Sequence, residues 1–156
     1  MTQQRHNSAG AIMLKGIDPL LTPELLQALR AMGHGNTIAI VDSNFPAAST
    51  GPPVIRLAGA SATDAANAIL SVLPLDDFVP ESAWCMEVVG DAQADLPVMK
   101  EFREAIRKHE GDKFALSKLE RFKFYEEASK AFCIVSTNEG RLYGNLLLKK
   151  GVVKEA

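Results

Sequence analysis

Hydrophobic positions along the chain alternate between helical spacing and the short continuous runs of buried strands. From 23 to 32 apolar residues recur every three or four positions, with Thr22 placed as an N-cap and Pro23 at the first helical position. Gly33 is a natural terminator, and the run 37–41 that follows is apolar and partly β-branched, as a buried strand requires. The pattern therefore predicts a helix followed closely by a strand.

The alternation continues to the C-terminus. Five further runs have the character of strands: 53–57, 83–89, 116–119, 131–136 and 142–148. Three stretches have helical spacing: 63–73 with Thr63 as its cap, 97–110 closed by Gly111, and 122–130. Because only residues 137–141 divide the last two strands, we expect a hairpin and hence a mixed sheet. The predicted fold class is α/β, a single domain whose mixed sheet is covered by helices on both faces.

Composition narrows the class of protein. A chain of 156 residues has the length of one domain, and 47% hydrophobic with 23% charged residues is typical of a globular protein. The net charge is −2 and the basic residues are scattered among acidic ones, so no nucleic-acid partner is expected. No apolar run approaches about 20 residues, which predicts no membrane span and no membrane partner.

Residues 1–12 are polar and lack the apolar segment of a signal peptide. We expect a disordered N-terminal tail over 1–12 and the folded domain over 13–156. Cys85 and Cys133 lie far apart in two apolar runs without the spacing of metal ligands. We interpret them as buried free thiols rather than a disulfide or part of a metal site, which suits a cytoplasmic protein.

The first candidate for chemistry is His34, held between Gly33 and Gly35 on the turn from helix to strand. Glycines let the backbone approach a ligand, and imidazole is the side chain whose ordinary pKa lies nearest neutrality. Asp42 stands at the carboxyl end of the following strand, where ligands gather in α/β sheets. On local sequence alone, a surface histidine and a loop-capping aspartate remain an alternative.

Other polar residues leave similar alternatives open. Asn145, in the strand pattern after Tyr143, either binds a ligand hydroxyl or marks a turn at Gly144 where it bonds its own backbone. Tyr125 is either a hydroxyl donor or a half-buried core aromatic, and Asp76 belongs to a carboxylate pair that is ordinarily solvated. The other histidines are expected in solvent (His109) and in the tail (His6), so no metal site is predicted. A phosphate-binding glycine loop and a nucleophile elbow are also missing from the sequence.

Taken together, the ordered motifs resemble the fucose mutarotase/ribose pyranase (FucU/RbsD) family over about nine tenths of the chain. Asn44-Phe45-Pro46 and Phe124-Tyr125-Glu126 favour the fucose branch. The motifs that carry the resemblance are, in chain order, Leu14-Lys15-Gly16-Ile17, Pro23-Glu24-Leu25-Leu26, Met32-Gly33-His34-Gly35, Asp42-Ser43-Asn44-Phe45-Pro46, Val54-Ile55-Arg56, Leu73-Pro74-Leu75-Asp76, Glu120-Arg121-Phe122, Phe124-Tyr125-Glu126, Tyr143-Gly144-Asn145 and Leu148-Lys149-Lys150-Gly151.

The resemblance implies a three-layer mutarotase domain over 13–156 that interconverts the α and β anomers of L-fucose or a related aldose by acid/base-catalysed ring opening, without a cofactor or metal. It implies a homo-oligomer, a decamer of two pentameric rings, with sites near subunit boundaries. Catalytic roles fall on His34, Asp76 and Tyr125, and contacts with the monosaccharide fall on Asp42, Met86, Arg121, Tyr143 and Asn145.

Two positions depart from the family pattern. Asn36 stands where an aspartate is common, which puts the orientation of His34 in question, and Ser43 replaces the usual alanine. Within the chemistry we expect His34 to move one proton, Asp42 to hold the imidazole or a sugar hydroxyl, and Tyr125 or Asp76 to move the second proton. Three rival functions remain open: a D-ribose pyranase, a sugar-binding or transport-accessory protein without catalysis, and a structural assembly module with no effect on sugars.

Overall fold

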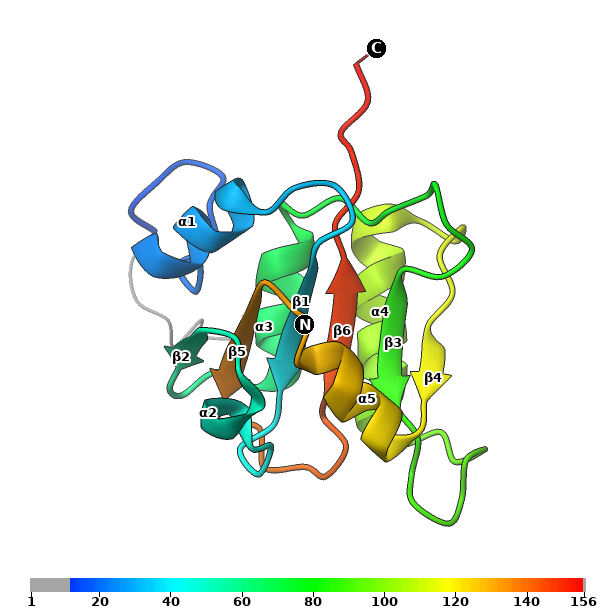
Figure 1. Cartoon of the computed structure of the whole chain (residues 1–156). Coiled ribbons are helices and arrows are strands. Elements are labelled where there is room, and N and C mark those ends of the chain that lie inside the picture. The colour runs from blue at the N-terminus through cyan, green and yellow to red at the C-terminus, as the bar shows by residue number, and fades with distance from the viewer. Residues whose placement is uncertain (1–11, 156) are drawn as a thin grey trace, which may run out of the picture.

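A mixed sheet of six strands runs through the middle of the protein in the order β2-β5-β1-β6-β3-β4 (Figure 1). The computed structural model describes residues 12–155, and the counts of elements refer to these residues. Five strands run in one direction, and β6 is antiparallel to both of its neighbours, β1 and β3. The strands are β1 (Thr37–Val41), β2 (Val54–Leu57), β3 (Ala83–Met86), β4 (Ser117–Leu119), β5 (Cys133–Thr137) and β6 (Leu146–Lys149).

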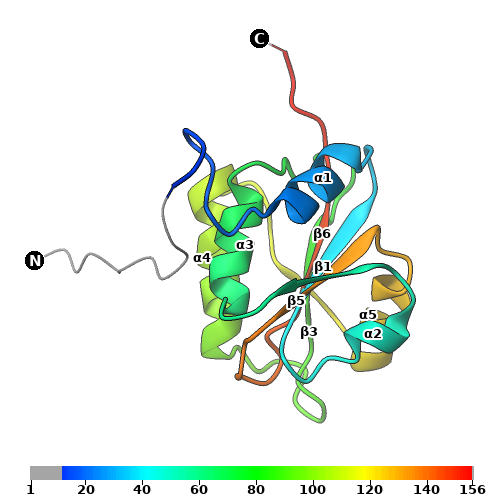
Figure 2. The ribbon, with the colours of Figure 1, turned by 90° about the vertical axis from the view of Figure 1, so that its left-hand side faces the viewer.

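Helices cover both faces of the sheet, which confirms the predicted α/β class. Figure 2 shows α3 and α4 on one face and α2 and α5 on the other. The helix α1 packs its apolar side into the same core cluster as α3 and α4. The helices are α1 (Pro23–Ala31), α2 (Ala47–Thr50), α3 (Ala62–Leu70), α4 (Pro97–Glu110) and α5 (Arg121–Ala128).

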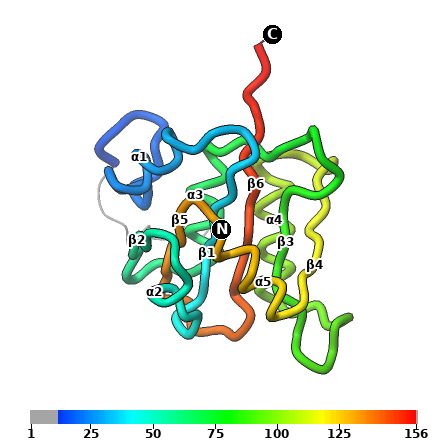
Figure 3. Tube along the Cα trace, viewed as in Figure 1, coloured from blue at the N-terminus to red at the C-terminus, as the bar shows by residue number. Residues whose placement is uncertain are grey.

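The predicted hairpin between the last two strands is wrong. β5 and β6 do not pair, because β1 lies between them, parallel to β5 and antiparallel to β6. The segment 138–145 therefore crosses the carboxyl end of β1, as the orange part of the tube shows in Figure 3. The sheet is mixed as predicted, although the reason is this crossing and not a tight turn.

Some predicted boundaries also shift. The N-cap of α3 is Ser61, whose Oγ accepts a hydrogen bond from the backbone N–H of Asp64 at 3.0 Å, so Thr63 is not the cap. β3 ends at Met86, before the turn at Gly90. β6 begins only at 146, so the Tyr143–Asn145 stretch lies in the preceding loop. The caps of α1 and α4, Thr22 and Gly111, are as predicted.

The core is built of two apolar layers, one on each face of the sheet. Cys85 and Cys133 are buried in it as free thiols, as predicted, and burial raises the pKa of each to about 11, which leaves them unreactive at neutral pH. In the part of the chain that the structure describes, none of the helices has the length and apolar character needed to cross a bilayer. The prediction of a disordered tail over 1–12 falls, except for Ile12, outside the described residues.

Candidate active site

Six of the eight predicted site residues line one pocket of about 240 Å³ at the carboxyl ends of β1 and β3. They reach it from the ends of both strands, from the start of α5 and from the loop before β6. Exposed apolar side chains, Val89 and Leu142, complete the lining together with Asn44 and Phe45. The six predicted residues in the pocket are Asp42, Met86, Arg121, Tyr125, Tyr143 and Asn145.

Asp42 and Asn145 form the buried polar base of this pocket. Their side chains are only 4% and 3% exposed. The Asn145 Oδ1 accepts a hydrogen bond from the backbone N–H of Asp42 at 2.9 Å, so the amide bonds the neighbouring strand end and not its own backbone. Burial raises the pKa of the Asp42 carboxyl above its ordinary value, and the N–H groups that face it offset only part of that effect. Both side chains are thus held by the fold with polar atoms available at the pocket.

Two tyrosines stand at the pocket's sides. Tyr143 has a φ of 63°, in the left-handed region that non-glycine residues rarely occupy, and its hydroxyl accepts a hydrogen bond from the N–H of Val89 at 3.1 Å. The Tyr125 ring packs against Phe45 with 5.3 Å between centroids, and its hydroxyl accepts a bond from the Arg121 Nε at 3.2 Å. Strain that the surrounding contacts hold in place is typical of ligand sites.

His34 and Asp76 form a second cluster, outside this pocket. The His34 Nε2 lies 2.9 Å from the Asp76 Oδ1, and the ring packs against Phe78 with 4.8 Å between centroids. The carboxylate is buried, 3% exposed, whereas the histidine side chain is 42% exposed. Asp76 is therefore not the solvated loop residue that local sequence favoured, and Asp42, 34 residues earlier, does not touch the imidazole.

The state of Asp76 fixes the tautomer of His34. Burial acts to raise the pKa of this carboxyl, but hydrogen bonds from His34 and from the backbone N–H of Phe78 outweigh it, and the pKa lies below its ordinary value. An ionised carboxylate only accepts hydrogen bonds. The proton between the two residues consequently sits on Nε2, and Nδ1 of the neutral ring carries the free lone pair.

The end of β6 holds this cluster together, which sequence reasoning missed. Gly35 donates its N–H to the Lys150 carbonyl at 2.8 Å, and Asp76 donates its own to the Lys149 carbonyl at 3.1 Å. A Cβ on Gly151 would lie 2.7 Å from the Asp76 Cα, so only glycine fits between the two loops. The only sequence signal was the Lys-Lys-Gly motif after the last strand.

Asn36, which stands where the family commonly has an aspartate, still supports the turn that orients His34. Its Oδ1 accepts a hydrogen bond from the N–H of Gly33 at 2.8 Å, closing the turn that carries His34. An aspartate would accept this hydrogen bond with the equivalent oxygen, so the turn keeps its shape. Ser43 is exposed and donates its backbone N–H to the Glu139 carbonyl at 2.9 Å, which any residue could do.

The two clusters lie at opposite ends of the sheet within one chain. His34 precedes β1 and Asp42 follows it, and five residues of strand span about 13 Å. The antiparallel β6 repeats this separation, with Asn145 before its start and Lys150 after its end. The site that the sequence predicted as one thus comes in two halves: the pocket of Asp42 and Asn145, and the pair of His34 and Asp76.

Other cavities and residues do not join these halves. A larger pocket of about 410 Å³ lies beside α5, lined by Trp84, Lys123 and Lys149, but it contains none of the predicted site residues. His109 is half-buried with its Nε2 3.2 Å from the Asn67 Oδ1, so the expectation of a solvent-exposed side chain is wrong. Among residues 12–155 the His, Cys, Asp and Glu side chains form no group of three or more that could hold a metal ion.

Comparison with known proteins identifies the family to which the chain is similar. A family model described as the RbsD / FucU transport protein family matches residues 15–153. The fucose mutarotase of Homo sapiens is 48% identical over 148 residues, which cover 91% of this chain and 96% of the relative. The crystal structure of the fucose mutarotase from Streptococcus pneumoniae in complex with L-fucose has a TM-score of 0.83 and 39% identity, covering 90% of this chain and all of that one.

A more distant structure shares the fold alone. Bacillus subtilis RbsD, solved with D-ribose, matches with a TM-score of 0.71 at 20% identity, over 86% of this chain and 95% of that one. The similarity is thus much higher on the fucose side, as the Asn-Phe-Pro and Phe-Tyr-Glu motifs predicted. With the family model spanning nearly the whole described domain and a relative 48% identical, this chain belongs to the RbsD / FucU transport protein family.

Proposed function

We propose that the protein is an L-fucose mutarotase, an isomerase that interconverts the α and β anomers of the sugar. The observation that carries the chemistry is the buried, ionised Asp76 on the His34 Nε2, which leaves Nδ1 of the ring for proton transfer. The substrate comes from the relatives, which are fucose mutarotases at 39–48% identity. Both lines of support agree with the function predicted from the sequence.

The reaction needs two proton movements and neither a metal nor a redox step. One group removes the proton from the anomeric hydroxyl while another protonates the ring oxygen, and the C1–O5 bond breaks to give the open aldehyde. Rotation about C1–C2 and reclosure, with both protons returned, gives the other anomer. Acid/base assistance of this kind contributes about 10²–10⁴-fold to the rate.

His34 carries one of these protons through Nδ1, and Asp76 orients the ring and stabilises its protonated form. Asp76 therefore acts through His34 and not as the second proton carrier, a role that falls to Tyr125. Asp42 and Asn145 read sugar hydroxyls at the base of the pocket, Tyr143 and Arg121 bind at its sides, and Met86 contacts the apolar face of the ring. Loss of any one of these hydrogen bonds would leave a buried polar group unpaired and so weaken binding.

A homo-oligomer completes the site in this proposal. The two halves lie at opposite ends of the sheet, while a monosaccharide is much shorter than the β1 strand between them. The exposed residues at the halves, Phe78 at 66% and Leu142 at 64%, offer apolar area for a contact between copies. We therefore expect the His34 half of one chain to face the Asn145 half of a neighbour, in the ring-shaped decamer that the family resemblance implies.

The primary test measures anomer exchange by NMR saturation transfer on L-fucose. Wild-type protein should accelerate exchange between the α and β resonances, and His34→Ala should abolish the acceleration, while the matched control His109→Gln should retain it. Equal exchange by wild type and His34→Ala would remove His34 from the chemistry. A wild type that binds fucose without accelerating exchange would make it a binding protein, and faster exchange on D-ribose would make it a pyranase.

The assembly has a separate test by complementation. His34→Ala chains are expected to be inactive, and Asn145→Ala chains to have little activity at fucose concentrations well below their raised KM. Mixed oligomers would pair the intact His34 of one chain with the intact Asn145 of the other. Random mixing should restore activity at about a quarter of the sites. Mixed oligomers without any recovered activity would contradict a site shared between chains. The two free thiols support a reducing compartment, and we propose that the enzyme works in the cytoplasm.

A further inference from the structure

The loop of residues 138–145, between β5 and β6, carries two walls of the sugar pocket. Tyr143 and Asn145 belong to it, and both bond groups outside it, namely the N–H of Val89 and the N–H of Asp42. At its start, the Glu139 carbonyl accepts a hydrogen bond from the N–H of Ser43 at 2.9 Å. The conformation of this loop therefore decides where the pocket's polar groups lie.

Glu139 is the buried charge of the loop, with a side chain 5% exposed. Its Oε2 accepts hydrogen bonds from the backbone N and the Nε of Arg141, each at 3.1 Å, and its Oε1 accepts one from Nη2 at 2.9 Å. These bonds hold the pKa of the Glu139 carboxyl below its ordinary value, although burial opposes them. A buried carboxylate that is ionised and fully paired folds the loop back on itself.

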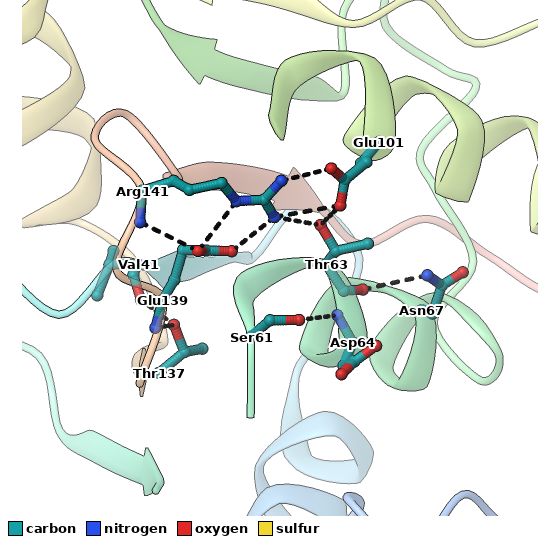
Figure 4. A network of polar contacts seen from close by, with 9 residues as sticks. All are labelled: Val41, Ser61, Thr63, Asp64, Asn67, Glu101, Thr137, Glu139 and Arg141. Carbon is teal, nitrogen blue, oxygen red and sulfur yellow. Dashed lines mark hydrogen bonds and ion pairs between the residues drawn. The ribbon is translucent and has the colours of Figure 1, made fainter. Parts of the chain in front are cut away.

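Arg141 joins this carboxylate to the helices behind the sheet. Figure 4 shows its guanidinium lying between Glu139 and Glu101, the latter on α4. Its Nη2 donates to the Glu101 Oε1 at 3.1 Å, and Nη1 bonds the other oxygen of the same carboxylate. The Thr63 hydroxyl, on α3, donates to the Glu101 Oε1 at 2.8 Å. The loop is thus tied to two helices whose packing belongs to the core.

Gly144 lets the Glu139 side chain pack against the backbone of the loop beside the pocket. A Cβ on Gly144 would lie 2.7 Å from the Glu139 Cγ and 3.6 Å from the Asp42 Cβ. The stem of Glu139 therefore lies directly against the backbone between Tyr143 and Asn145, under a turn where Tyr143 holds a φ of 63°. A conformation of this kind persists only where its surroundings hold it.

We propose that Glu139 and Arg141 are positioning residues of the sugar site, whose ion pair, anchored on Glu101, holds the 138–145 loop so that Tyr143 and Asn145 face the substrate. The inference rests on the proposed function, since it assigns these residues to the same pocket. They touch no sugar atom in this role. Loss of the pair would weaken binding while leaving the proton chemistry of His34 at the other end of the sheet intact.

The first readout needs no sugar and so remains informative even if the protein turns over none. The chain has two tyrosines, Tyr125 and Tyr143, and both line the pocket. Protein labelled with 3-fluorotyrosine should give two ¹⁹F resonances, assigned with Tyr125→Phe. Glu139→Gln should shift or broaden the resonance of Tyr143 and leave that of Tyr125 in place. The matched control is Asp112→Asn, which removes an exposed ion pair with Arg107. Arg107 lies on α4, the helix that also carries Glu101.

The second readout separates binding from chemistry in the anomer-exchange assay. Glu139→Gln should raise KM for L-fucose about tenfold and change kcat by less than about twofold. Arg141→Lys, which keeps the charge but cannot bond both carboxylates with a planar fork, should give an intermediate KM. Asp112→Asn should match the wild type in both readouts.

Two outcomes would overturn the proposal: a Tyr143 resonance and KM unchanged in Glu139→Gln, or a fall in kcat with KM unchanged. If circular dichroism shows that Glu139→Gln does not fold, Glu101→Gln decides in its place. That variant cuts the half-exposed far end of the network, with Glu101 at 41% exposure, and should still move the Tyr143 resonance. A Tyr143 resonance at its wild-type position there would likewise refute the anchoring role.

Discussion

The substitution Asp76→Asn changes one oxygen of the buried pair into an NH₂ group of nearly the same size. The asparagine Oδ1 can take the place of the Asp76 Oδ1, which accepts hydrogen bonds from the N–H of Phe78 at 3.0 Å and from the His34 Nε2 at 2.9 Å. The NH₂ group then replaces the other oxygen, so both hydrogen bonds and the proton on Nε2 can remain. The variant loses the negative charge, which stabilises the imidazole while Nδ1 holds a second proton. The nitrogen that we assign to proton transfer therefore accepts a proton less readily.

The expected loss follows from the charge that is removed. A hydrogen bond to a charged group contributes about 1.5–3 kcal/mol and a neutral one about 0.5–1.5 kcal/mol. The difference of about 1–2 kcal/mol corresponds to roughly 5–30-fold if it is fully felt in the transition state. We therefore expect anomer exchange to fall by roughly 5–30-fold in Asp76→Asn, with the proton still on Nε2 of the neutral ring.

The assay combines exchange spectroscopy on L-fucose with ¹⁵N spectra of labelled histidine, which distinguish protonated Nε2 from protonated Nδ1. The matched control is Asp77→Asn, because the neighbouring carboxylate is paired with Lys154 at 2.7 Å and does not contact the imidazole. This control should keep the wild-type rate and tautomer. Anomer exchange within about twofold of the wild type in Asp76→Asn would refute the assigned role of the pair.

Three further outcomes follow from the same contacts. Gly151→Ala should lower the free energy of unfolding by more than about 2 kcal/mol in urea titrations, because its Cβ would meet the Asp76 backbone at 2.7 Å. Asn145→Ala leaves the buried N–H of Asp42 without its partner, so it should cost about 1–3 kcal/mol of stability and raise KM for fucose. Folding lowers the pKa of the Asp76 and Glu139 carboxyls below their ordinary values of 3.8 and 4.5. Their contribution to the free energy of unfolding is therefore complete above those ordinary values and is lost as the pH falls through the folded-state values. The urea midpoint in equilibrium titrations should accordingly decline on acidification from about pH 5.

Local sequence signals correctly predicted the helices whose ends are set by capping residues and glycines. The helix α1 forms where expected because the Thr22 hydroxyl caps it and Pro23 opens it, and α4 stops at Gly111 because that glycine takes a φ of 79°. The hairpin failed because strand pairing is a contact between segments distant in sequence. A short connection favours pairing between the two strands that it joins, but β1 lies between them and pairs with β5 on one side and with β6 on the other.

The site was predictable as a set of residues but not as an arrangement. Six of them meet because strand ends in an α/β sheet share an edge. We expected Asp42 to hold the His34 imidazole or a sugar hydroxyl and Asp76 to be a possible proton carrier, whereas Asp76 bonds the ring. Spacing along the chain does not reveal which carboxylate lies behind the ring. Glu139 and Arg141 gave no signal at all, because a charged pair in a loop is ordinarily solvated and only the fold buries one of them.

The direction of β6 decides which of its ends lies at which half of the proposed site. Had β6 run parallel to β1, its start would lie beside His34 and its end beside Asp42. Because it is antiparallel, its first residues follow Asn145 at the proposed sugar pocket, and its last residues lead to Lys150 between the His34 turn and the Asp76 loop. A four-residue strand is stiff and about 10 Å long, so it fixes the separation of the two halves. The fold of each chain consequently fixes the distance between the two halves. In the shared site that we propose, the packing of one chain on the next would bring a His34 half and an Asn145 half together.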